Sequence, residues 1–350
     1  MKPVKLTSPR VWRTYRGGKL IDAIHGIDGK DTLFPEEWIM STVIARNAGR
    51  EHIPDEGMCY LEDGTSFLKF ISKSPQAALS QQHLRKWGIT TGVLVKIIDA
   101  GERLTIQAHP DKETAMRLFG SPFGKTECWH ILGGRAVDGE EPCIYLGFRE
   151  GITREYWEDV FHRQDIPAML SCLHRFPVKP GETYLIQGGV PHAIGAGCLL
   201  IEIQEPTDYT VRTERITPNG LHIADSMCHQ GLGFEKMFDC FHYEGVSQEQ
   251  AYQNWCIPPQ LLEETPVYTR KELVGPSQTD CFRLERYDIT GSCTIESDGI
   301  FSGIYLFSGS GTLNGRPFSP GDQFFLGAAC ESCLVQASTP VTLFRCFGPK

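Results

Sequence analysis

Two stretches of the chain, residues 178–194 and 318–334, follow one pattern. They read VKPGETYLIQGGVPHAI and FSPGDQFFLGAACESCL, each with Pro-Gly, then an acidic residue, then an aromatic residue two places later. A Pro-Gly turn before a short strand that ends in a loop is typical of jelly-roll barrels. The pattern therefore predicts two related β-barrels, and the second copy has no histidine to match His192 of the first.

Short β-rich runs between turn signals occupy much of the remaining chain. Residues 91–109, 178–205 and 303–326 each alternate such runs with turns, and Asn314-Gly315 is a hairpin signal. These regions predict a mainly β protein built from two jelly-roll barrels.

Two stretches instead have apolar residues at helical spacing. The first is residues 111–119, and the second is residues 152–175, with a break between two helices marked by Pro167. We therefore expect a small helical insertion at about residues 110–175 of the first barrel.

The balance of charge limits the partners of this chain. Its 350 residues include 43 acidic and 34 basic ones, which gives a formal net charge of −9. An acidic chain without a basic block is a poor binder of nucleic acid and of anionic membranes. No apolar run is long enough to span a bilayer, and the polar N-terminus does not resemble a secretory signal. We expect a cytoplasmic protein with neither nucleic acid nor membrane as a partner.

The cysteine pattern favours reduced thiols. Thirteen cysteines are scattered singly through apolar stretches, which is typical of buried thiols in a reducing compartment. Cys330 and Cys333 form the only CxxC motif, and no second pair stands at the spacing of a zinc ribbon. We interpret this pair as structural.

Residues able to bind a metal stand in three short motifs of the first predicted barrel. Gln107 and His109 are two residues apart, so on a strand they face the same side, and the same holds for Lys125 and Glu127. His192 follows a Gly-Gly turn. Two histidines and a carboxylate suit Zn²⁺, with iron or manganese as chemical substitutes. A neutral Gln ligand would leave such a site positive and electrophilic.

Four motifs carry a resemblance to a known family. In chain order, between Leu94 and Arg212, they read LVKIIDAGERLTIQAHPD, GKTECWHIL, GGVPHAIGAG and DYTVR. Together they resemble the class I mannose-6-phosphate isomerases, which are zinc-dependent cupin enzymes, and in particular their shorter bacterial branch. PEEWIMST at residues 35–42 is similar to an early stretch of that family. The C-terminal part matches only in style, as a second cupin barrel.

The resemblance implies roles for the residues that match these motifs. Four of them correspond to the ligands of one zinc ion: Gln107, His109, Glu127 and His192. Three correspond to residues at the sugar phosphate: Thr105, Lys125 and Arg212. Of these three, Lys125 and Arg212 are the implied catalytic residues. We expect a catalytic cupin domain over residues 1–245 and a metal-free cupin domain over residues 246–350.

The chain departs from the family pattern in two places. Thr105 stands where the family commonly has Ser, which keeps the hydroxyl group and adds a methyl group. The family often has Trp-Gly-Gly near the N-terminus, whereas here RTYR separates Trp12 from Gly17-Gly18.

The implied activity interconverts mannose 6-phosphate and fructose 6-phosphate by proton transfer between C1 and C2 through a cis-enediolate. Zinc, with Arg212 or Lys125 nearby, would stabilise the negative charge of that species. The same cations would allow an acidic protein to bind a sugar phosphate. The general base is left open between Lys125, a zinc-bound hydroxide, and a further His or carboxylate.

Two other kinds of protein fit the same barrel. One is another metal-dependent cupin enzyme, such as a glucose-6-phosphate isomerase or a dioxygenase, although an extra Gln ligand is unfavourable for oxygen chemistry at iron. The other is a non-catalytic sugar-binding or regulatory cupin, since cupins serve many functions. The presence of both Lys125 and Arg212 favours an enzyme. The oligomeric state is left open.

Overall fold

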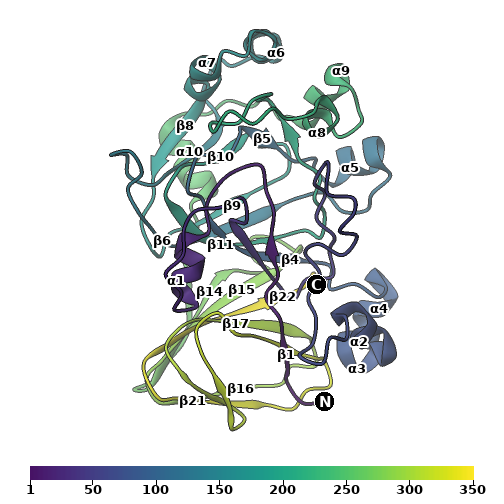
Figure 1. Ribbon diagram of the computed structural model, residues 1–350, viewed down its shortest axis with the longest axis vertical. Coiled ribbons are helices and arrows are strands. Elements are labelled where there is room, and N and C mark those ends of the chain that lie inside the picture. The colour runs from purple at the N-terminus through teal and green to yellow at the C-terminus, as the bar shows by residue number, and fades with distance from the viewer.

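The computed structural model describes residues 1–350 as four sheets stacked along the long axis of the molecule (Figure 1). Every pairing between neighbouring strands is antiparallel. This arrangement confirms the predicted mainly β fold with two barrels, and it excludes a parallel α/β sheet.

The first barrel, in the upper part of Figure 1, is formed by a five-stranded and a six-stranded sheet. In hydrogen-bonded order, the five-stranded sheet contains β12 (Val211–Arg212), β5 (Gln107–Ala108), β10 (His192–Ile194), β7 (Cys143–Phe148) and β8 (Leu173–Pro177). The six-stranded sheet contains β2 (Arg10–Val11), β3 (Glu36–Ile39), β4 (Leu94–Asp99), β11 (Cys198–Gln204), β6 (Glu127–Gly134) and β9 (Thr183–Ile186).

The second barrel, in the lower part of Figure 1, is formed by a seven-stranded and a four-stranded sheet. The seven-stranded sheet contains β1 (Val4–Leu6), β20 (Gln323–Leu326), β17 (Ser302–Ser308), β22 (Val341–Phe347), β15 (Arg283–Ile289), β14 (Tyr268–Val274) and β13 (Gln260–Glu264). The four-stranded sheet contains β16 (Ser292–Ile295), β21 (Cys333–Ala337), β18 (Gly311–Leu313) and β19 (Arg316–Phe318).

The two predicted turn motifs fold alike. The Pro-Gly turns place Gly181 and Gly321 at φ values of 96° and 85°, where an L-residue would be strained. In each turn the following acidic residue accepts a hydrogen bond from the amide three residues earlier, Lys179 in one copy and Ser319 in the other. The hairpin between β18 and β19 turns at Asn314-Gly315, as predicted.

The six-stranded sheet is buried on both faces, as strand β11 illustrates. All seven residues of β11 are buried, and its side chains alternate between two cores. Leu199, Ile201 and Ile203 pack in the layer between the two barrels, whereas Leu200 packs inside the first barrel. The side chain of Glu202 lies on the same inner face as Leu200 and is the one charged side chain of β11.

Helices cover the outer surfaces of the sheets. Those predicted from apolar spacing are found as α5 (Lys112–Phe119), α6 (Arg154–Arg163) and α7 (Ile166–Ser171), and Pro167 lies in the first turn of α7. The sequence analysis did not predict the remaining helices: α1 (Lys19–Ile24), α2 (Phe67–Lys73), α3 (Pro75–Leu79), α4 (Gln81–Trp87), α8 (Asp225–His229), α9 (Phe234–Met237), a 3₁₀ turn (Phe238–Cys240) and α10 (Gln248–Trp255).

The missed helices α2 and α4 are short and are set by caps rather than by a long apolar stripe. Ser66 accepts a hydrogen bond from the amide of Lys69, and Ser80 accepts one from the amide of His83. Pro75 occupies the first turn of α3, where its missing N–H is no loss. Serines and a proline at these positions were the available signal.

Three further observations concern the chain as a whole. Strand β1 pairs with β20, so the N-terminal residues extend a sheet of the second barrel, and the predicted domain boundary near residue 245 stays a prediction. All thirteen cysteines are free and twelve are buried, as expected. None of the helices has the length and apolar character needed to cross a membrane.

A substitution in the layer between the barrels tests whether the two barrels unfold together. Phe344 of β22 is fully buried there, with its ring centroid 5.6 Å from that of His130 on β6. We expect Phe344→Ala to lower the free energy of unfolding by about 3–5 kcal/mol, the usual cost of deleting a buried Phe. All six tryptophans precede residue 260, so urea titration followed by tryptophan fluorescence reports on the first barrel.

The control for this test is Leu334→Ala, which truncates a side chain that is 39% exposed and should change stability little. A Phe344→Ala protein whose fluorescence transition does not move would show that the barrels unfold independently.

Candidate functional site

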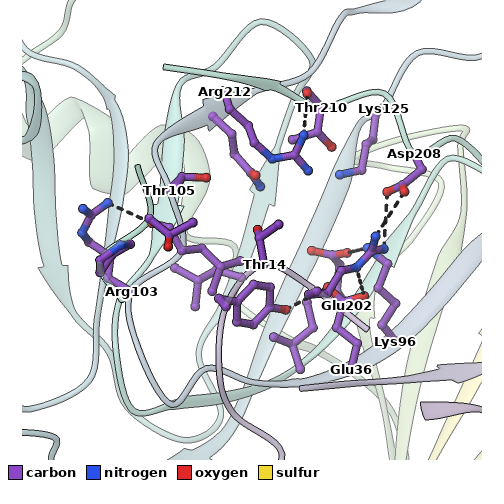
Figure 2. Close-up of a pocket in the computed structure, with 18 residues that line it drawn as sticks. Thr14, Glu36, Lys96, Arg103, Thr105, Lys125, Glu202, Asp208, Thr210 and Arg212 are labelled. Carbon is purple, nitrogen blue, oxygen red and sulfur yellow. Dashed lines mark hydrogen bonds and ion pairs between the residues drawn. The ribbon is translucent and has the colours of Figure 1, made fainter. Parts of the chain in front are cut away.

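A cavity opens into the first barrel where the inner faces of β4, β11 and β6 become charged (Figure 2). Four of the predicted site residues line it: Thr105, Gln107, Lys125 and Arg212. The other three, His109, Glu127 and His192, are no more than 1% exposed and contact this lining directly. The structure therefore brings all seven predicted site residues together.

The register of the five-stranded sheet places three of these residues in one row. Gln107 of β5 lies directly opposite His192 of β10 on one side and opposite Arg212 of β12 on the other. Side chains at directly paired positions lie on the same face of a sheet. Gln107, His192 and Arg212 are therefore neighbours because of strand pairing, although they are far apart in the sequence.

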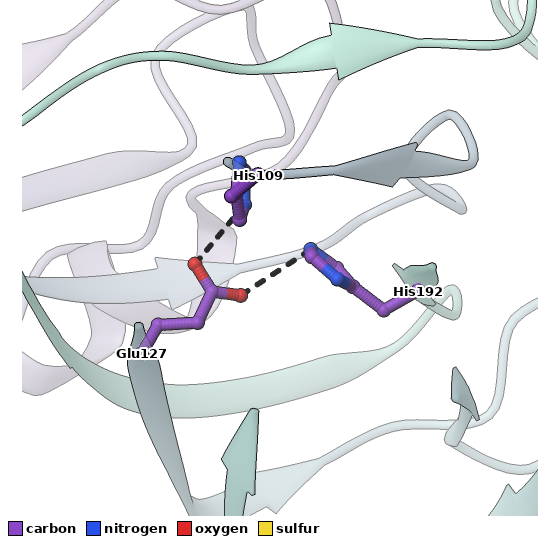
Figure 3. A group of neighbouring side chains, drawn as sticks. All are labelled: His109, Glu127 and His192. Atoms are coloured by element: carbon purple, nitrogen blue, oxygen red, sulfur yellow. Dashed lines mark ion pairs between the residues drawn. The ribbon is translucent and has the colours of Figure 1, made fainter. Parts of the chain in front are cut away.

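Glu127, the first residue of β6, reaches this row from the six-stranded sheet (Figure 3). Its Oε2 atom is 3.2 Å from His109 Nε2, and its Oε1 atom is 3.3 Å from His192 Nε2. The ligand atoms of these three residues all lie within 4.8 Å of one another. Such convergence of two imidazoles and a carboxylate is the geometry of a small metal site.

Backbone carbonyl groups hold both imidazole rings in the orientation that a metal ligand needs. His109 Nδ1 is 2.8 Å from the carbonyl oxygen of Tyr209, and His192 Nδ1 is 2.9 Å from that of Val190. Each Nδ1–H therefore donates to a carbonyl, which leaves the Nε2 lone pair directed at Glu127. Burial lowers the pKa of both rings, that of His109 to about 3, so both are neutral.

The carboxylate of Glu127 shows that a metal fits this cluster. Both of its oxygens are buried without a hydrogen-bond donor, although they face the lone pairs of two imidazoles. A buried anion in that position is costly unless a cation compensates it. A divalent metal would satisfy the carboxylate and both Nε2 atoms together. The amide of Gln107, with Nε2 3.3 Å from His192 Nε2, can offer its oxygen to the same metal after rotation.

Lys125 adds one positive charge at the edge of the cluster. Its Nζ atom is 2.8 Å from His109 Nε2 and 3.3 Å from Glu127 Oε2. Burial is opposed by the charge of Glu127, and the net effect lowers the pKa of Lys125 below its ordinary value. Although burial acts in the opposite direction, the charge of Lys125 holds the pKa of Glu127 well below its usual range.

Arg212 is the one cationic side chain of the cavity without a carboxylate within 4.0 Å. The cations that line the cavity are Arg13, Lys96, Arg103, Lys125 and Arg212. Two acidic residues close to Arg212 in the sequence have other partners: Asp208 pairs with Arg13, and Glu214 pairs with Arg103. Arg212 donates only to the carbonyl groups of Thr210 and Met227. Its charge is therefore left for an anion in the cavity.

Sequence reasoning missed several charged residues of the cavity. Lys96 of β4 forms an ion pair of 2.6 Å with Glu202 of β11, and Trp129 donates to the other oxygen of Glu202. Burial raises the pKa of Glu202 despite the charge of Lys96. A charged residue inside an apolar strand, as in LVKIID and CLLIEIQ, was the signal that could have identified both. Arg13, Glu36 and Asp208 carried no comparable signal.

Comparison with known proteins gives one consistent group. Mannose-6-phosphate isomerase ManA of Bacillus subtilis is 25% identical over 244 residues, which cover 67% of this chain and 68% of that protein. The probable mannose-6-phosphate isomerase GmuF of the same organism is 27% identical over 243 residues, or 67% and 69% of the two chains. No protein-family model matches the chain.

Solved structures show the same fold over the whole chain. The crystal structure of mannose 6-phosphate isomerase from Bacillus subtilis has a TM-score of 0.75 at 22% identity and covers 99% of both chains. A zinc-bound mannose 6-phosphate isomerase has a TM-score of 0.74 at 14% identity and covers 100% of both chains. The sequence relatives and the two-barrel architecture therefore agree, and the chain is similar in sequence and in fold to mannose-6-phosphate isomerases.

Proposed function

We propose that this protein is a zinc-dependent isomerase that interconverts mannose 6-phosphate and fructose 6-phosphate. The observation that carries the proposal is the buried carboxylate of Glu127, whose oxygens have no hydrogen-bond donor and face two imidazole lone pairs beside a cavity with an unpaired arginine. A metal centre and an anion site thus share one enclosed space. The names of the sequence relatives support this choice of substrate.

Four side chains would hold the metal: Gln107, His109, Glu127 and His192. Two neutral nitrogen donors and one carboxylate are the ligands that zinc prefers, and a neutral Gln oxygen leaves the site with a net charge of +1. When bound, zinc supplies positive charge beside the sugar oxygens, which stabilises the negative charge that develops during proton transfer.

Arg212 and Lys125 would act on the substrate itself. Removal of a proton next to the sugar carbonyl creates a cis-enediolate, whose charge is costly in a cavity unless fixed cations face it. The guanidinium of Arg212 keeps its charge at any working pH, and its fork fits a phosphate or the two enediolate oxygens. Thr105 lines the same cavity and offers a hydroxyl to the sugar phosphate.

Lys125 is better placed than the carboxylate of Glu202 to move the proton between C1 and C2. Its partners are His109 and Glu127, whose lone pairs a bound metal takes up, so its amine is left for the substrate. Glu202 also lines the cavity, but one of its oxygens is engaged by Lys96 and the other by Trp129.

Metal removal tests the proposal as a whole. We expect the purified protein to convert mannose 6-phosphate in a coupled assay, to lose that activity when a chelator removes zinc, and to recover it when zinc is added back. His109→Ala should lose both the metal and the activity, because it deletes one ligand and leaves Glu127 buried without compensation. Metal analysis of the variant checks this expectation.

The matched control for His109→Ala is His130→Ala. His130 is equally buried and lies on β6 close to Glu127, but its ring packs against Phe344 in the layer between the barrels. That variant should keep one zinc per chain. If His109→Ala binds one equivalent of zinc with unchanged affinity, the proposed ligand set is wrong.

Arg212 should matter for turnover and not for the fold. We expect Arg212→Ala to lower kcat/KM by a factor on the order of 10² or more, as for other removed transition-state donors. Its zinc content and Tm should stay close to those of the wild type, because no salt bridge is broken. Arg212→Lys should recover part of the loss, since it keeps the charge without the fork.

Arg215→Ala serves as the control for Arg212, because Arg215 lies three residues further along the chain and does not line the cavity. An Arg212→Ala protein that melts early, yet turns over normally when folded, would assign Arg212 a purely structural role.

Isotope exchange separates the two candidates for the base. In deuterated buffer, the wild type should exchange the proton at C2 of the substrate, and we expect Lys125→Met to abolish this exchange while sugar phosphate still binds. Glu202→Gln should retain measurable exchange, because it keeps the shape of a residue whose oxygens face Lys96 and Trp129. Normal exchange in Lys125→Met would exclude Lys125 as the base.

A further inference from the structure

The loop between β11 and β12 supplies backbone groups that orient two of the site residues. The carbonyl oxygen of Tyr209 accepts the hydrogen bond from His109 Nδ1 at 2.8 Å. The next carbonyl, that of Thr210, accepts a hydrogen bond of 3.1 Å from the guanidinium of Arg212. A shift of this loop would therefore move both the imidazole of His109 and the guanidinium of Arg212.

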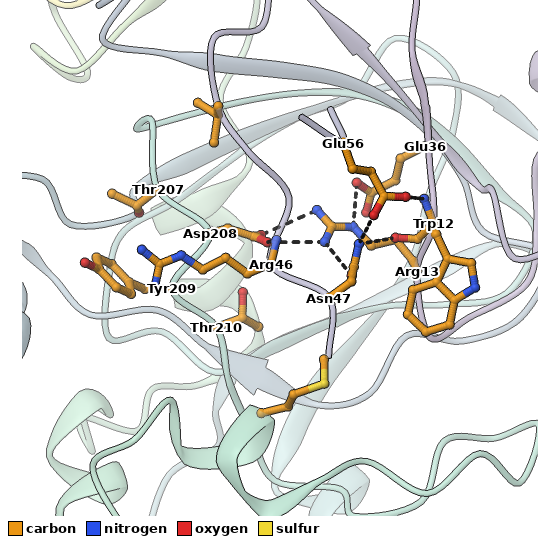
Figure 4. Close-up of polar contacts among 12 residues, drawn as sticks. Trp12, Arg13, Glu36, Arg46, Asn47, Glu56, Thr207, Asp208, Tyr209 and Thr210 are labelled. Carbon is orange, nitrogen blue, oxygen red and sulfur yellow. Dashed lines mark hydrogen bonds and ion pairs between the residues drawn. The ribbon is translucent and has the colours of Figure 1, made fainter. Parts of the chain in front are cut away.

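Asp208 holds this loop through its side chain. The carboxylate is only 7% exposed and makes two contacts with the guanidinium of Arg13, of 3.2 Å and 3.4 Å. It also accepts a hydrogen bond of 3.0 Å from the backbone amide of Arg46 (Figure 4). A buried carboxylate with three charge-assisted or backbone contacts has little freedom to move.

Arg13 is in turn fixed to the framework of the barrel. Its Nε atom is 2.9 Å from Oε2 of Glu36, a residue of β3 in the doubly buried six-stranded sheet. Glu36 also accepts hydrogen bonds from Tyr15 and Trp38, so its position is set from three sides. The path from the sheet to the loop therefore consists of the buried residues Glu36 and Arg13 and the half-buried Asp208.

Arg46 and Asn47, in the segment after β3, also contact this group of residues. Asn47 accepts from Arg13 and donates to the carbonyl group of Trp12 and to Glu56, and the guanidinium of Arg46 lies over the ring of Tyr209 at 5.0 Å (Figure 4). The guanidinium of Arg13 is thus held in one orientation by the groups around it.

Arg13 belongs to the RTYR stretch by which this chain departs from the Trp-Gly-Gly pattern near the N-terminus. The contact therefore joins a residue outside the family motifs, Arg13, to Asp208 of the DYTVR motif.

We propose that Arg13 and Asp208 form a positioning pair, which sets the carbonyl groups of Tyr209 and Thr210 and through them the orientation of His109 and Arg212. The inference rests on the proposed function, because it assigns His109 to the metal and Arg212 to the substrate. Neither Arg13 nor Asp208 is a catalytic residue in this assignment, since each acts through another residue.

Asp208→Asn tests the pair with little risk to folding. The substitution keeps the shape of the side chain, and Arg13 retains Glu36 as its counter-ion. We expect zinc affinity, measured by competition with a chelator, to fall by about 10-fold, the lower end of the effect of changing a residue that orients a metal ligand. The visible absorption of the cobalt-substituted protein should change, since that spectrum reports ligand geometry. KM for the sugar phosphate should rise.

Arg13→Lys is the second variant, and Glu285→Gln is the matched control. Arg13→Lys keeps the charge but loses the fork that makes two contacts with Asp208, so it should shift zinc affinity and the cobalt spectrum in the same direction. Glu285 is a buried carboxylate paired with Arg270 in the second barrel, and neutralising it should leave zinc affinity unchanged.

The outcomes separate this inference from the proposed function. A wild-type protein without zinc or isomerase activity overturns the proposed function, and the positioning role falls with it. A zinc-dependent wild type whose Asp208→Asn and Arg13→Lys variants keep the zinc affinity and cobalt spectrum overturns the positioning pair alone. The positioning pair is also overturned if Glu285→Gln loses as much zinc affinity as Asp208→Asn, because the loss would then reflect general destabilisation of the protein.

Discussion

The six-stranded sheet has no face in contact with water, and the other layers are arranged around that constraint. One face packs against the second barrel, and the other lines the interior of the first. Because side chains alternate along a strand, each residue of β4, β11 and β6 is committed to one of these two environments. Lys96, Glu202 and Glu127 lie on the inner face near the cavity, whereas Asp99 at the end of β4 pairs with Leu199 on the other face and is compensated by Arg135. The charged residues of the site thus lie on the inner face of a buried sheet, beside the cavity.

Buried charges in such a place need partners of opposite charge, and among the cations of the cavity only Arg212 has none. Lys96 pairs with Glu202, Arg13 with Glu36 and Asp208, and Lys125 with Glu127. These pairs compensate the cost of removing each group from water. Arg212 has no carboxylate, and Glu127 has no hydrogen-bond donor. Arg212 thus lacks an anionic partner, and the carboxylate of Glu127 lacks a hydrogen-bond donor, at the same cavity. A site that binds an anionic substrate and a metal cation requires both.

The sequence predicted what depends on local pattern. Alternation and turn residues identified the strands, and spacing of two placed Gln107 with His109 and Lys125 with Glu127 on common faces. The short helices α2 to α4 were missed because two serine caps and one proline in a first turn, and not an apolar stripe, define them. The contact of Arg13 with Asp208 joins segments at opposite ends of the first barrel sequence, so no local pattern could reveal it. The same holds for the pairing of β1 with β20.

That last pairing has a consequence for the order in which the protein is made. Val4 pairs with Phe325, so β1 is synthesised long before its partner strand β20. Until then, the edge of β1 is exposed to other chains or must be shielded. Contacts between residues so far apart form slowly, because loop closure precedes the gain in contact energy. Strand β1 therefore takes its place in the sheet only after most of the second barrel has been synthesised.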